Sequence, residues 1–264
     1  MIYEIVVLFL AGWGAGVITG LIGASAVAVV VPTLMIFLNY EAYVAIGVGL
    51  AIDVFASSMA AYTYDEHGNT DLRAGLLMAV ASVIGAFIGS WFSTPIPSPR
   101  LGGTSGFITL CIGLAFFIEP HTETGRNFQE MRIVKTIKKR LKKRKHVSSV
   151  FIGLGVGIIA GVIGAGGGLM FLLALVIALD FPMHKAVGTS VIIMIFTASS
   201  GAVGHIFYGD IMLTAILIGS VGGVIGSRSA STFANLATEK RLKKAVGVTF
   251  MVLGGTLFLA EVVL

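Results

Sequence analysis

Residues 12–24 read GWGAGVITGLIGA, and residues 153–165 read GLGVGIIAGVIGA. The two segments are identical at eight of thirteen positions. The same offset, which takes Gly12 to Gly153, aligns Val83-Ile84-Gly85 with Val224-Ile225-Gly226, so the register continues without a gap. An unbroken register over such a length predicts that the chain contains an internal duplication.

The composition places this duplicated chain in a membrane. Of 264 residues, 56% are hydrophobic and 12% are charged, and the mean hydropathy is +0.97. These values exclude a soluble enzyme, and long continuous apolar runs exclude a barrel of alternating strands. The one cysteine, Cys111, excludes a disulfide framework, a cysteine-ligated metal site and a two-thiol redox centre. We expect no metal and no cofactor. The N-terminal run lacks a basic start, which predicts a retained first helix.

Each half opens with an apolar stretch that is interrupted by small residues, at 2–38 and at 148–180. The arm after each interruption is too short to span, at about 20 Å and 18 Å as helix. Three further runs in each half are long enough to cross about 30 Å of hydrocarbon. These runs are 42–63, 72–93 and 101–118, then 186–208, 211–233 and 243–263.

The positive charges decide the topology. If each opening stretch folds back to its own side, sixteen of the eighteen Lys and Arg lie on one face, as the positive-inside rule requires. We therefore predict an all-α polytopic membrane protein with two inverted repeats, each a broken-helix hairpin plus three spanning helices. The first repeat covers 1–118, a basic cytoplasmic linker covers 119–147, and the second repeat covers 148–264. Both termini are then external, in the plasma membrane of a prokaryote.

The linker holds ten of the eighteen cations, but its basic run 138–145 has no interleaved aromatic residues and is flanked by membrane helices. These features argue against a nucleic-acid partner. Ile133, Ile137 and Leu141 recur at helical spacing, which is compatible with an amphipathic helix on anionic lipid. A solvated topological loop explains the linker equally well, and a homo-oligomer is left open.

The two interruptions are candidate substrate sites. A helix that begins inside the membrane directs unpaired N–H groups and the positive end of its dipole at the cavity, which favours a small anion. The candidate substrate-binding residues are Gly23, Ala24, Ser25, Gly164, Gly166, Gly167, Gly168, Thr189 and Ser190. The alternative is that glycines only allow close helix crossing, and this is what we predict for Gly12, Gly16, Gly20, Gly153, Gly157 and Gly161 at their spacing of four.

Charged residues within spans are few. Asp53 lies deep in the 42–63 run and is the candidate for proton coupling, with Ser57 one turn on as a partner, although a protonated structural Asp is an alternative. Arg228 lies near the cytoplasmic end of its run, where snorkelling is the default and a contact to Asp53 or an anion is the alternative. His205 is an interfacial histidine or an anion contact.

Four segments carry a family resemblance: the glycine run 161–168, LDFPMHKAVGTS at 179–190, HIFYGDI at 205–211, and HGNTDLR at 67–73. Over essentially the whole chain these segments resemble the sulfite exporter TauE/SafE family of sulfite, sulfonate and anion permeases. The resemblance implies export of sulfite or an organosulfonate such as sulfoacetate. In the first half, Ala24-Ser25-Ala26 stands where the family has glycines, which gives the second half more weight.

Together these observations predict a secondary transporter that moves a small sulfur-containing oxyanion by alternating access, with Asp53 as the proton carrier. A passive anion channel on the same scaffold is the alternative. An intramembrane enzyme is poorly supported, because the chain has no His-Glu-x-x-His pair and no second deep Asp.

Overall fold

The computed structural model describes residues 2–93, 145–163, 168–208, 212–242, 244–248 and 251–252. All regular structure in these ranges is helical, which confirms the predicted all-α class. The helices are α1 (Ile2–Ile22), α2 (Val27–Leu38), α3 (Ala42–Glu66), α4 (Leu72–Ser93), α8 (Lys145–Ile163), α9 (Gly168–Leu173), the π-helix η1 (Ala174–Ala178), α10 (Met183–Tyr208) and α11 (Leu213–Leu236). The predicted span 101–118, most of the linker and most of 243–263 lie outside the described residues.

The described helices follow the repeat offset found in the sequence. Under this offset α1 corresponds to α8, α2 to α9 with η1, α3 to α10 and α4 to α11. The runs predicted at 42–63 and 72–93 are α3 and α4, and those at 186–208 and 211–233 are α10 and α11. One boundary differs, because α8 begins at Lys145, inside the stretch predicted as linker.

The turns repeat as well as the helices. Asn39 and Asp180 are related by the same offset, and both have a left-handed backbone, with φ of 53° and 56°. Directly after each of them an N–H donates to a carbonyl six residues back, from Tyr40 at 3.2 Å and from Phe181 at 3.1 Å. A left-handed residue of this kind ends a helix. The two turns related by the offset therefore have the same backbone conformation.

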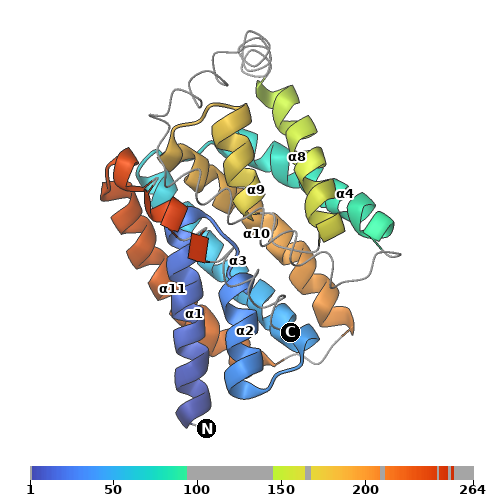
Figure 1. Ribbon diagram of the computed structural model, residues 1–264, viewed down its shortest axis with the longest axis vertical. Coiled ribbons are helices and arrows are strands. Elements are labelled where there is room, and N and C mark those ends of the chain that lie inside the picture. The colour runs from blue at the N-terminus through green and yellow to red at the C-terminus, as the bar shows by residue number, and fades with distance from the viewer. Residues whose placement is uncertain are drawn as a thin grey trace.

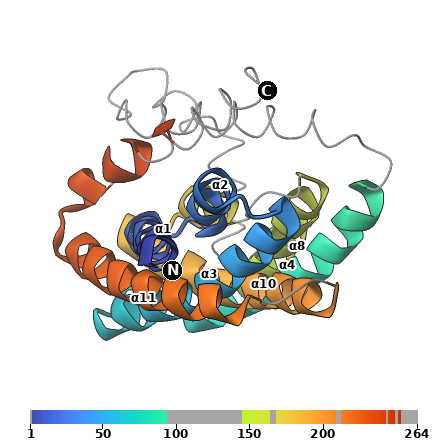
Figure 2. The same ribbon diagram turned by 90° about the horizontal axis from the view of Figure 1, so that it is seen from below.

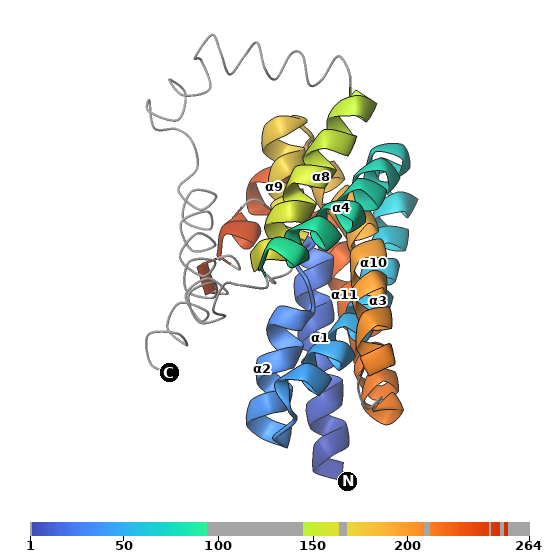
Figure 3. The same ribbon diagram turned by 90° about the vertical axis from the view of Figure 1, so that its right-hand side faces the viewer.

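The helices are arranged as two hairpins on a layer of longer helices. Seen from below, α3, α4, α10 and α11 lie along one side, and α1, α2 and α8 lie above them (Figure 2). In Figure 3 the α1–α2 hairpin occupies the lower half of the molecule and the α8–α9 hairpin the upper half. Helix α1 starts at the bottom of Figure 1, whereas α8 starts near the top, so the related helices run in opposite directions.

Closely spaced glycines make the two tightest helix crossings. A Cβ built on Gly12 or Gly16 of α1 would lie 1.9 or 2.0 Å from a carbonyl oxygen of α11. The related crossing of α8 on α4 is alike: a Cβ on Gly153 or Gly157 would lie 2.6 or 2.3 Å from a carbonyl oxygen of α4. These glycines let two backbones touch, as predicted from their spacing.

Four of the described helices are long and apolar enough to cross a membrane: Ile2–Ile22, Tyr43–Glu66, Met183–Val203 and Leu213–Leu236. Helix α2, with 12 residues, and the stretch Gly168–Ala178 are apolar but shorter. They rise only about 18 Å. The second arm of each hairpin is therefore short, as the sequence predicted.

Candidate functional site

The first interruption is a short non-helical segment between α1 and α2 (Figure 1). It starts at Gly23, whose φ of +65° is a left-handed conformation that glycine adopts without strain. The Thr19 hydroxyl donates to the Ala24 carbonyl of this segment at 2.9 Å, and the buried Tyr64 hydroxyl donates at 3.1 Å to the Gly20 carbonyl in the last turn of α1. These bonds stabilise an irregular backbone in an apolar interior.

Asp53 on α3 lies directly against this interruption. Its side chain is buried, with 2% exposure, and the Ser25 hydroxyl donates to Oδ2 at 2.6 Å. The backbone N–H of Ala26 also donates to the carboxylate, and the Ser57 hydroxyl donates to Oδ1 at 3.2 Å. The predicted Ser57 contact is confirmed. The contact with Ser25 was missed, because it joins residues 28 apart on different elements.

The second interruption separates α8, which ends at Ile163, from α9, which begins at Gly168. The candidate residues Gly164, Gly166 and Gly167 lie outside the described residues. Gly168 is buried, and a Cβ built on it would lie 2.8 Å from the carbonyl oxygen of Gly23 and 2.6 Å from Sδ of Met194. The ends of the two hairpins are therefore in contact with each other.

The neighbouring hydroxyls of α10 have different surroundings. A Cβ built on Gly23 would lie 2.3 Å from Oγ of Ser190, so Ser190 borders the first interruption; its hydroxyl donates to the Val187 carbonyl at 2.8 Å. The Thr189 hydroxyl instead accepts the N–H of Asp71 at 3.1 Å, just before α4. Ser190 thus borders the first interruption at Gly23, whereas Thr189 binds the loop between α3 and α4.

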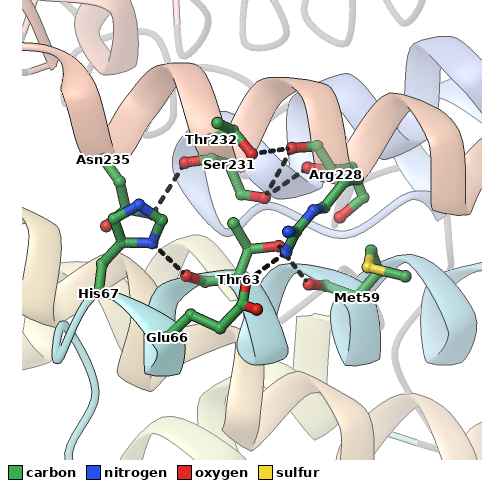
Figure 4. Close-up of polar contacts among 9 residues, drawn as sticks. Met59, Thr63, Glu66, His67, Arg228, Ser231, Thr232 and Asn235 are labelled. Atoms are coloured by element: carbon green, nitrogen blue, oxygen red, sulfur yellow. Dashed lines mark hydrogen bonds and ion pairs between the residues drawn. The ribbon is translucent and has the colours of Figure 1, made fainter.

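Arg228 on α11 lies beside Thr63 and Glu66 of α3 (Figure 4). Its Nη1 donates to Glu66 Oε2 at 2.5 Å and to Thr63 Oγ1 at 3.0 Å, and its guanidinium lies 5.6 Å from the Tyr62 ring centre. Glu66 and Asp53 are about 20 Å apart along α3. The alternative contact between Arg228 and Asp53 is therefore wrong, and its half-exposed side chain, at 45%, agrees with a position at the helix end.

Further side chains join helix ends near Arg228. The His67 Nδ1 lies 2.7 Å from the Thr63 carbonyl, and the Asn69 amide donates to Asn235 Oδ1 at 2.6 Å, which connects the α3–α4 loop with α11. Sequence reasoning missed this connection, because no pattern relates residues 166 apart. His205 lies on α10, but its side chain is outside the described part of the chain.

Comparison with known proteins agrees with this architecture. A probable membrane transporter protein, YdhB of Bacillus subtilis (strain 168), is 27% identical over 248 residues, which cover 90% of this chain and 94% of YdhB. YunE of the same organism, also a probable membrane transporter protein, is 24% identical over 261 residues, or 94% and 95% of the two chains. No solved structure matches the chain.

The family comparison covers nearly the whole chain. The model of the family described as sulfite exporter TauE/SafE matches residues 8–257, which include both hairpins and the cluster around Asp53. The match agrees with the apolar helices that are long enough to span a membrane and with the transporter names of the relatives. The chain is therefore a multi-pass membrane protein of a transporter class. The chain belongs to the sulfite exporter TauE/SafE family.

Proposed function

We propose that this protein is a secondary transporter that exports a small sulfur-containing oxyanion, such as sulfite or an organosulfonate, across the plasma membrane of a prokaryote. The observation that carries the proposal is the contact between the two interruptions, where Gly168 lies against Gly23. Two helices, α2 and α9, begin near this contact, and the N-terminal ends of helices favour anions. The family description supports the choice of oxyanion.

Alternating access fits a molecule built from two related halves. The related helices α1 and α8 run in opposite directions, and the hairpin ends meet between the halves (Figure 3). A rocking motion of one half against the other would expose the anion first to one side of the membrane and then to the other. In this proposal the linker is cytoplasmic, where its cations lie close to anionic lipid. Asp53 carries the coupling proton.

Transport assays with purified protein in vesicles test the proposal. We expect uptake or release of labelled sulfite, sulfoacetate or thiosulfate by the wild-type protein, and a loss of at least tenfold in the rate for Gly166→Leu. The control is Gly155→Leu, because a Cβ at Gly155 meets no atom within 4 Å. Absence of flux for all three anions in the wild-type protein would contradict the proposal. Flux that ignores an imposed proton gradient would instead favour a passive anion channel and would leave Asp53 without a coupling role.

A further inference from the structure

Three donors converge on one buried carboxylate at the first interruption. The Ser25 hydroxyl, the Ala26 N–H and the Ser57 hydroxyl all donate to Asp53, which leaves this acid fully paired in its ionised form. The first two donors belong to the interruption itself and to the N-terminal end of α2. An ionised Asp53 is therefore itself an anion bound where α2 begins, the place that a helix dipole makes favourable for negative charge.

Two of these donors, the Ser25 O–H and the Ala26 N–H, lie where α2 begins, which is where the proposed function places the substrate anion. A hydroxyl hydrogen that is directed at Oδ2 of Asp53 at 2.6 Å is not available to a second acceptor. A second anion beside an ionised carboxylate is also opposed by like-charge repulsion, which is strong in an apolar interior. The carboxylate and the substrate anion therefore compete for the donors of this interruption.

The described part of the second half has no such carboxylate. The position related to Asp53 by the repeat offset is Met194, which lies against Gly168, and the position related to Ser57 is Ala198. Asp53 is also the one buried carboxylate among the described residues. One competing acid among the residues that the structure describes indicates one proton for each transport cycle.

No other described acid or base is placed to replace Asp53. The elements packed against α3 are α1, α2, α10 and α11. Their described charged or titratable side chains are all at least partly exposed: Tyr3 and Glu4 on α1, His184 and Lys185 on α10, and Arg228 on α11. Glu4 accepts a bond from Tyr40 and Arg228 is paired with Glu66, so both have partners away from Asp53.

We infer that Asp53 competes with the substrate anion for the donors at the first interruption, so that one proton binds to Asp53 each time one anion binds. This inference rests on the proposed function. A proton from the aqueous side adds to the carboxylate, the Ser25 O–H and the Ala26 N–H are released, and both then donate to the anion. Loss of the proton on the other side restores the carboxylate, which displaces the anion. Proton and anion move in the same direction, one to one, so export is driven by an outward anion gradient and carries one proton outward with each anion.

The wild-type protein in vesicles gives the first test. Labelled sulfite and labelled thiosulfate are the probes, and thiosulfate is included because its charge does not change near neutral pH. The proton gradient that just balances an opposing anion gradient measures the coupling ratio. We expect one proton for each anion, and we expect the initial rate to rise up to about tenfold per unit of acidification. A ratio of zero or two with active transport would overturn the inference and leave the proposed function intact.

Variants on the same helix give the second test. Asp53→Asn removes the competing charge, and we expect downhill anion flux to persist with less than a twofold change per pH unit. The control is Asp65→Asn, the same chemical change at the exposed end of α3, which should keep the wild-type pH dependence. Ser25→Ala should raise KM for the anion severalfold with the one-proton dependence unchanged. An Asp53→Asn variant with the wild-type pH dependence would disprove the inference, whereas a wild-type protein that moves neither anion would contradict the proposed function.

Discussion

At the scale of single residues, the glycines of α1 fall into two sets that differ in what lies next to them. A Cβ at Gly16 would lie 2.0 Å from a backbone oxygen of α11, whereas the nearest atom to a Cβ at Gly14 is a side-chain carbon at 3.8 Å. We expect Gly16→Ala to destabilise the protein by about 1–3 kcal/mol, because two backbones must separate. Gly14→Ala should be neutral or stabilising by up to about 1 kcal/mol, because alanine favours a helix. Unfolding in detergent measures both, and equal effects would contradict the proposed crossing.

At the scale of elements, the interruption between α1 and α2 depends on the backbone conformation of Gly23 and on its packing against Ser190. Gly68, in the loop after α3, allows the two effects to be measured separately. Its φ of +67° is nearly that of Gly23, but a Cβ at Gly68 would meet no atom within 4 Å. We expect Gly68→Ala to cost about 1–2 kcal/mol through backbone strain alone. Gly23→Ala should cost about 1–3 kcal/mol more through overpacking against Ser190, and it should slow anion flux. If the two variants unfold at the same temperature, the contact with Ser190 contributes nothing.

At the scale of the whole molecule, the predicted topology places the α2–α3 loop outside the cell and the α3–α4 loop in the cytoplasm. Single cysteines in a Cys111→Ser background test this directly. Glu41→Cys, just before α3, should react with a membrane-impermeant maleimide in intact cells. Arg73→Cys, exposed in the first turn of α4, should react only after the membrane is opened. The physical reason is that sixteen of eighteen cations are retained on one side. The opposite labelling pattern would show that the orientation is reversed.

Local patterns in the chain predicted the helical class, the repeat offset and the position of the interruptions. These features depend on local chemistry: apolar runs long enough to span, glycine where a helix stops, and an offset that the turns at Asn39 and Asp180 repeat. The sequence also identified Asp53 and its neighbour Ser57, because partners one helical turn apart follow from helix geometry.

Only the tertiary structure decided which distant groups meet. It brought Ser25 to Asp53, Gly168 to Gly23, and Glu66 to Arg228. These contacts depend on how closely α1 approaches α11, how α8 approaches α4 and how α3 lies between them, and no local pattern in the chain encodes such distances. The deep carboxylate was therefore visible in the sequence, but the donors that surround it became known only when the helices were packed together.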